Sequence, residues 1–164
     1  MRHEDMERDF DGWVKATRQI LSLMEKPDLW ALFDSAPAPT FFKNRICILG
    51  DAAHASTPHQ GAGAGQAIED ALILSRVMAH VNRPDDIPKA FAAYDKVRRP
   101  RSQKQVAKAR EAGLLYDLQL SGVEDDWDKI KERLAVRQRW IWEHDLEADI
   151  KEAERLVKAE VSKL

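Results

Sequence analysis

The sequence predicts a mostly helical chain with one buried strand, which would form part of a larger α/β fold. Apolar residues recur at helical spacing through much of the 164 residues, whereas residues 45–50 carry the one clear strand pattern. A single strand leaves its backbone N–H and C=O groups unpaired unless another strand lies beside it. We therefore expect further protein to complete the fold; pairing within an oligomer and a purely helical bundle are the alternatives.

The first predicted element is a helix over residues 6–25. Pro27 lies just past its end, and a connecting stretch with Pro37 and Pro39 occupies residues 28–44. The apolar residues that define the helical face are spaced three and four apart: Met6, Phe10, Trp13, Val14, Leu21 and Met24.

A strand, a glycine-rich turn and a buried helix are predicted in succession over residues 45–81. The β-branched run of the strand, residues 45–50, stops at Gly50 and Asp51, and small residues continue to Gly65. The helix over residues 64–81 carries apolar side chains nearly all round, which is typical of a buried helix.

The remaining chain is predicted to be helical. A helix capped by Asp85 or Asp86 is expected to run to about residue 120 with an interruption at Pro100, and two amphipathic helices follow it. The expected division is thus residues 1–83, part of a ligand-binding domain, and residues 84–164, a C-terminal helical region.

Composition excludes several classes of function. The net charge of −2 gives no overall attraction to nucleic acid, and no apolar run approaches the length of a membrane span. The single cysteine, Cys47, cannot form an internal disulfide. A basic run between Lys96 and Arg110 is interpreted as a solvated helix face, because no aromatic residues interleave with it; a nucleic-acid or nuclear-import patch is the alternative.

The turn after the predicted strand is the candidate binding site. Asp51 lies at the carboxyl end of the strand, where α/β folds place ligands, and it can accept hydrogen bonds from the hydroxyls of a sugar or polyol. Gly61, Gly63 and Gly65 allow a ligand to approach backbone N–H groups, and the following helix N-terminus adds partial positive charge. Such a site favours a phosphate, or a ligand that becomes anionic during reaction.

Other chemistry at this turn is disfavoured. His54 and His59 with Asp51 could suggest a metal site, but no third strong ligand has suitable spacing, so we predict no metal. Asp51, His54 and Ser56 are too close in sequence for a catalytic triad, and no Gly-x-Ser-x-Gly elbow is present.

Residues 45–76 resemble the second cofactor motif, the "GD" motif, of group A flavoprotein monooxygenases. The segment over residues 57–66, which begins Thr57-Pro58-His59-Gln60-Gly61, is most similar to the salicylate-hydroxylase-like branch. Further segments resemble the same family: Phe41 to Asn44, Ala90 to Tyr94, Arg98 to Arg101, and Trp140 to Asp145. The resemblance implies FAD contacts at Gly50, Asp51, Pro58, Gly61, Ala62, Gly63 and Ala64, with Asp51 on the ribityl chain and the helix N-terminus at the ring.

The function that the resemblance implies is hydroxylation of a salicylate-like aromatic substrate with FAD, NAD(P)H and O₂. The chemistry would be that of the cofactor, so no residue here need be a catalytic acid or base. The family's N-terminal Gly-x-Gly-x-x-Gly fingerprint and its Asp-Gly motif are not in this sequence. We therefore expect weak or no FAD binding without an N-terminal half; the alternative is a non-catalytic helical interaction module derived from such an enzyme.

The last three residues, Ser162-Lys163-Leu164, match the address that the peroxisomal import receptor recognises. They predict a peroxisomal location, with a cytoplasmic one as the alternative.

Overall fold

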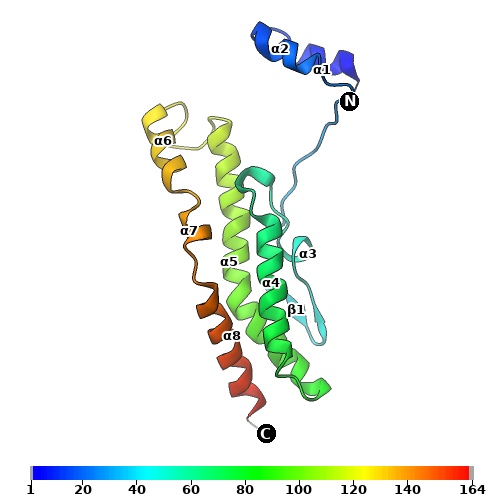
Figure 1. The fold of residues 1–164 in the computed structure, drawn as a ribbon, viewed down its shortest axis with the longest axis vertical. Helices are drawn as coiled ribbons and strands as arrows, with labels where there is room; N and C mark the ends of the chain where they lie inside the picture. The colour runs from blue at the N-terminus through cyan, green and yellow to red at the C-terminus, as the bar shows by residue number, and fades with distance from the viewer. Residues whose placement is uncertain (1, 163–164) are drawn as a thin grey trace. The chain divides into compact units, whose positions relative to one another are not determined.

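The computed structural model describes residues 2–162. The chain divides into two compact units, Met1–Leu32 and Phe33–Leu164 (Figure 1). Lys163 and Leu164, which carry most of the predicted peroxisomal address, lie outside the described residues. No helix within residues 2–162 combines the length and the apolar character that crossing a bilayer requires.

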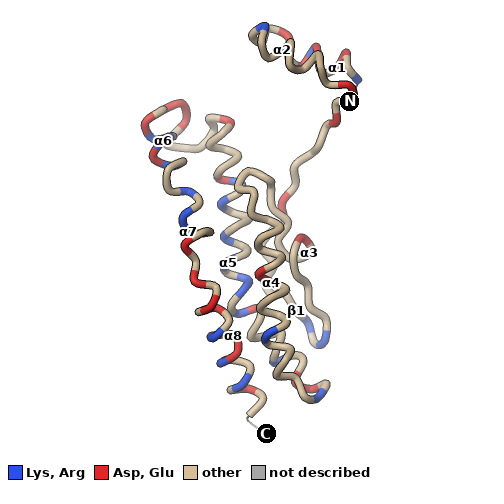
Figure 2. Tube along the Cα trace, in the orientation of Figure 1, with Lys and Arg blue, Asp and Glu red and all other residues tan. Residues whose placement is uncertain are grey.

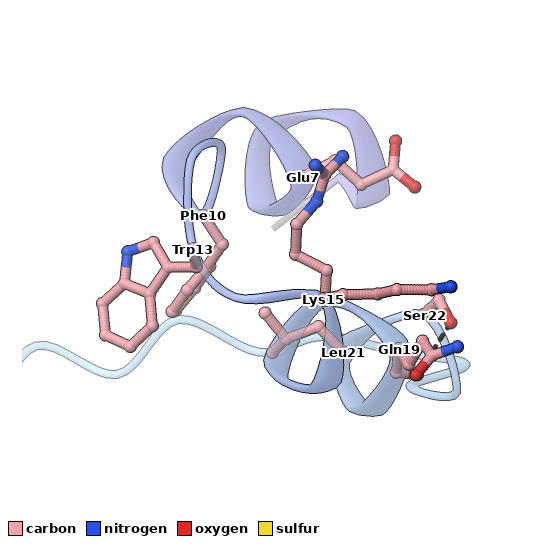
Figure 3. A pocket seen from close by; sticks show the side chains of 8 residues that line it. Glu7, Phe10, Trp13, Lys15, Gln19, Leu21 and Ser22 are labelled. Carbon is pink, nitrogen blue, oxygen red and sulfur yellow. Dashed lines mark hydrogen bonds between the residues drawn. The ribbon is translucent and has the colours of Figure 1, made fainter.

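The first unit contains two short helices, α1 (His3–Asp9) and α2 (Lys15–Leu21). The prediction of one helix over residues 6–25 was wrong, because Gly12 between the two helices has a φ of +82°. The rings of Phe10 and Trp13 meet edge to face at this bend, with 5.2 Å between the ring centroids. The two side chains lie close together in Figure 3.

A short hairpin opens the strand region of the second unit. Strand β1 (Phe42–Lys43) pairs antiparallel with β2 (Ile46–Cys47), and Asn44 in the connecting turn has a φ of +54°. The single strand predicted over residues 45–50 is therefore shorter and locally paired. Ile46 is 73% exposed and Leu49 is 38% exposed, so the rest of the described chain does not bury this run. Among the described residues the run joins only a two-stranded sheet and not a larger one with covered faces.

Three long helices form the core of the second unit. They are α4 (Gly63–Met78), α5 (Ile87–Tyr116) and α8 (Leu146–Val161), which pack against one another (Figure 1). The buried cluster at their contact consists of Phe41, Ala53, Ile73, Val77, Ala90, Ala93, Tyr94, Ile150, Ala153 and Val157. The predicted helix over residues 64–81 was expected to be buried in a complete protein, and this stays a prediction; among the described residues its outer face is open, with Ile68 70% exposed.

Helix α5 continues through Pro100, contrary to the predicted interruption. A proline inside a helix removes a backbone hydrogen bond and costs about 3 kcal/mol or more. Arg98 and Arg101, on either side of it, are both held by carboxylates of α4, so tertiary contacts keep the two halves of α5 in line.

The chain after α5 completes the second unit. Helices α6 (Trp127–Val136) and α7 (Arg139–Trp142) precede α8. The carboxylates of Asp126 and Asp145 accept hydrogen bonds from backbone N–H groups in the first turns of α6 and α8. The division predicted between residues 1–83 and 84–164 stays a prediction about a whole protein. In this chain, helices from both sides of residue 83 share one core.

Candidate functional site

The turn that follows β2 places Asp51 at the start of a short helix, α3 (Asp51–His54). Gly50 before it has a φ of +57°, and a Cβ at Gly50 would lie 3.3 Å from the Cβ of Ala67 in α4. Only glycine combines this conformation with so close an approach to the helix. Within residues 2–162 the Asp51 carboxylate is exposed and has no hydrogen-bond partner, so it is available to a ligand.

A second turn leads into α4. Pro58 begins a 3-10 turn, η1 (Pro58–Gln60), Gly61 adopts the left-handed conformation, and Ala62 precedes the helix without a side-chain cap. The backbone N–H groups of Gly63, Ala64 and Gly65 therefore have no partner among the described residues.

The space in front of these N–H groups is open. A Cβ built at Gly61 or at Gly65 meets no atom within 4 Å. Unpaired N–H groups and the helix dipole attract negative charge, and the missing side chains let a flat ligand approach the backbone. The geometry at the predicted contact residues is therefore compatible with a ligand that carries or develops an anionic edge.

A buried polar network supports this turn from behind. Asp70 of α4 is fully buried; its Oδ2 accepts from the backbone N–H of Gly50 at 3.0 Å and lies 2.5 Å from Nε2 of His54, while its Oδ1 accepts from Nε of Arg98 at 2.8 Å. Burial raises the pKa of Asp70, but the hydrogen bonds from His54, Gly50 and Arg98 outweigh it, so that the pKa lies below its ordinary value. An ionised Asp70 thus fixes the conformation of Gly50, directly before Asp51.

Arg98 extends the network along α4. Its guanidinium donates to Oε2 of Glu69 at 2.6 Å and to Oε1 of Gln66 at 2.9 Å, while Arg101 contacts both carboxylate oxygens of Glu69 at 2.7 and 2.8 Å. Burial raises the pKa of Glu69, but the two arginines lower it by more than burial raises it. The pKa of Glu69 therefore lies below its ordinary value.

Sequence reasoning missed this network. The interpretation of the basic run as a solvated face was wrong for Arg98 and Arg101, which are 0% and 8% exposed. A usable signal was the adjacent pair Glu69 and Asp70 in the middle of a largely apolar helix, since buried carboxylates require cationic partners. The spacing Arg98 to Arg101 places two such partners on one face of α5.

The rest of the basic run makes surface contacts along α5, where Figure 2 shows a row of Lys and Arg. Arg99 pairs with Asp95 at 3.0 Å, and the Lys104 ammonium lies 4.6 Å from the centre of the Trp140 ring. An aromatic residue distant in sequence therefore does stack on this run, although none interleaves with it.

The histidines of the turn do not converge on Asp51. His54 pairs with Asp70, and Nδ1 of His59 lies 2.9 Å from the Thr57 hydroxyl oxygen. Within residues 2–162 no group of three or more His, Cys, Asp or Glu side chains is arranged to hold a metal ion.

Two larger hollows contain none of the predicted contact residues. One, of about 500 Å³, lies in the first unit and is lined by exposed side chains that include Trp13 and Lys15 (Figure 3). The other, of about 160 Å³, lies in the second unit beside α5. The larger hollow contains none of the residues that the turn chemistry singled out, so its size alone does not make it the functional site.

Comparison with known proteins places the turn within a described family. Residues 29–109 match the model of the family described as "FAD binding domain". The chain is 41% identical over 153 residues to a 6-methylsalicylate 1-monooxygenase of Aspergillus terreus, covering 93% of this chain and 34% of that protein. It is 41% identical over 145 residues to a salicylate hydroxylase of Pseudomonas putida, covering 88% of this chain and 33% of that protein.

A solved structure contains a similarly folded segment. The structure described as a salicylate hydroxylase substrate complex superposes with a TM-score of 0.86 at 42% sequence identity, covering 93% of this chain and 38% of that one. The chain thus spans about a third of the length of the curated relatives that it matches.

Proposed function

Because the chain belongs to the FAD-dependent monooxygenases of the salicylate-hydroxylase type, we propose that it supplies the part of such an enzyme that contacts the ribityl chain and the ring of FAD. The main observation behind this proposal is that two sets of ligand-binding groups in one loop region have no hydrogen-bond partner among the described residues. These are the free carboxylate of Asp51 and the unpaired N–H groups of residues 63–65.

The residues present fit this group. Asp51 would accept hydrogen bonds from ribityl hydroxyls, and Gly50, held by Asp70, sets its position. The turn from Pro58 to Gly61 would lie beside the flavin ring, where the open space at Gly61 leaves room for it. The backbone at Ala62, Gly63 and Ala64 would face the edge of the ring that gains negative charge on reduction.

The cofactor would supply the redox chemistry, namely reduction by NAD(P)H and transfer of one oxygen atom from O₂ to an aromatic ring. The role of this chain is to orient the flavin and to stabilise charge on it. We propose a salicylate-like aromatic acid as substrate, since the named relatives act on salicylate or 6-methylsalicylate.

A chimera tests this function. The matching third of the Pseudomonas putida salicylate hydroxylase is replaced by this chain, and FAD content and salicylate hydroxylation are measured. We expect bound FAD and hydroxylation, with at least tenfold weaker FAD binding in Asp51→Ala, because hydrogen bonds to a charged group contribute about 1.5–3 kcal/mol. Asp128→Ala, on the exposed surface of α6, is the matched control.

Failure of the chimera would have a clear meaning. A folded chimera that binds no FAD, or one in which Asp51→Ala binds as tightly as the parent, would contradict the proposed flavin contacts. A stable helical oligomer without flavin would instead support the interaction-module alternative.

We also propose that Ser162-Lys163-Leu164 directs the protein to peroxisomes. The support is the match of this tripeptide to the receptor-read address. A fluorescent protein fused before residue 1 should accumulate in peroxisomes, and deletion of Leu164 should return it to the cytoplasm. Diffuse fluorescence of the intact fusion would contradict the assignment.

A further inference from the structure

A pocket of about 160 Å³ lies between η1, α5, α6 and α7, and it shares no residue with the proposed flavin contacts. Its walls are formed by Gln60, Lys108, Glu111, Ala112, Leu115, Arg133, Val136, Arg137 and Trp140.

Two buried polar atoms in this wall have no partner among the described residues. They are Oε1 of Gln60 and Nε1 of Trp140, and Gln60 as a whole is only 6% exposed. A buried polar atom left without a hydrogen bond costs about 1–3 kcal/mol, so such atoms usually have a ligand or water. Both atoms belong to side chains that line the pocket, and neither has accessible surface in this structure, so a ligand reaches this acceptor and this donor once the two side chains rotate toward it.

The charges around the pocket favour an anion. Three cationic side chains, Lys108, Arg133 and Arg137, line it against one carboxylate, Glu111, which leaves an excess of two positive charges. Lys108 lies 2.5 Å and Arg133 4.0 Å from the Glu111 carboxylate, which is therefore shared between them. Among residues 2–162, the recorded polar and ring contacts of Arg137 are with the neutral carbonyl of His59, at 3.3 Å, and with the Tyr116 ring.

The remaining wall is apolar. Ala112, Leu115 and Val136 contribute aliphatic surface, and Trp140 contributes an indole ring. An apolar cavity of about 150 Å³ is large enough for benzene in other proteins, so this pocket can hold a body of about one ring.

We propose that this pocket binds a small hydroxycarboxylate with an apolar body. With the two side chains rotated toward it, its carboxylate would accept from the indole N–H of Trp140 and lie among the three cations, while its hydroxyl would donate to Oε1 of Gln60. The ligand would contact Gln60, which directly precedes Gly61, and so would lie against the same turn that is proposed to hold the flavin. This inference goes beyond the proposed function and does not depend on it.

Three related probes separate the features of the ligand. Mandelate carries the ring, carboxylate and hydroxyl; phenylacetate lacks the hydroxyl, and benzyl alcohol lacks the carboxylate. Each is titrated into the ¹⁵N-labelled chain without FAD, and the indole N–H signal of Trp140, assigned with Trp140→Phe, is followed. We expect mandelate to shift this signal, with about tenfold weaker binding for each of the other two, since each loses one buried interaction.

Matched variants locate the site. Arg133→Met should weaken mandelate binding, whereas Arg155→Met, which removes an exposed cation of α8, should not. Gln60→Met should abolish the preference for mandelate over phenylacetate while the shift at Trp140 persists, a result that unfolding could not give.

Several results would overturn the proposal. If none of the probes moves the Trp140 signal, the pocket holds only water. If benzyl alcohol binds as well as mandelate, the cations do not select an anion. If Arg133→Met and Arg155→Met weaken binding equally, the effect is one of general surface charge. The absence of FAD keeps each of these outcomes separate from a failure of the proposed flavin site.

Discussion

The guanidinium of Arg98 and the carboxylate of Asp70 form an ion pair of 2.8 Å in which both side chains are 0% exposed. Asp70 uses its other oxygen to hold the backbone N–H of Gly50. The pair therefore joins two core helices, α5 and α4, to the turn that presents Asp51. Stability of the fold and geometry of the candidate site depend on the same buried carboxylate.

Replacement of Arg98 should be severely destabilising. Arg98→Met leaves Asp70 buried and Glu69 partly buried without this cation, and loss of one partner of a buried ion pair costs about 3–5 kcal/mol. Urea denaturation measures the change in the free energy of unfolding. The control is Arg155→Met, which removes an exposed i,i+3 pair with Glu152 and should change the free energy of unfolding little. Equal effects of the two variants would argue against the network.

The contribution of Asp70 to stability should depend on pH. Its pKa is lowered in the folded protein, so the stabilisation is fully present above the ordinary value of 3.8 and is lost as pH falls through the folded pKa. The free energy of unfolding of Asp70→Asn should therefore lie well below that of the parent at about pH 7, and the difference should narrow towards about pH 3. A difference that is constant over this range would contradict an ionised Asp70.

Gly65→Ala should separate stability from flavin binding. Gly65 lies in the first turn of α4, where a Cβ meets nothing within 4 Å, and replacement of a helical glycine by alanine adds about 0.5–1 kcal/mol of stability. In the salicylate hydroxylase chimera the same methyl group would occupy the space proposed for the flavin ring. We expect a higher melting temperature together with weaker FAD binding. Unchanged FAD binding would count against a ring in contact with this turn.

Gly113→Ala should have the opposite effect on stability. A Cβ at Gly113 in α5 would lie 2.8 Å from Cε1 of the His59 ring, closer than atoms can pack. His59 would have to move, and overpacking of this kind costs about 1–3 kcal/mol, more than the helical gain from alanine. Thermal unfolding of Gly113→Ala beside Gly65→Ala provides the comparison at two helical glycines. A stabilised Gly113→Ala would show that η1 does not pack tightly on α5.

The sequence predicted the local order of elements well. The small residues between Gly50 and Gly65 indicated a turn leading into a helix, and the structure has α4 beginning at Gly63. It predicted a single helix over residues 6–25 wrongly, because the apolar residues keep a helical period across Gly12, whose positive φ ends the first helix. It also predicted an interruption at Pro100 that contacts with another helix prevent, since Arg98 and Arg101 bind α4 on both sides of it.

The amino-acid sequence by itself determined the helical periodicity, the glycine turns and the family resemblance, because each depends on residues that are neighbours in the chain. Tertiary structure alone decided which charges are buried. Asp70 and Arg98 are 28 residues apart, and nothing local distinguishes Arg98 from the exposed cations around it. The same holds for the pocket beside Trp140, whose walls come from η1, α5, α6 and α7. Desolvation and ion pairing depend on distances in space, and these exist only once the helices have packed.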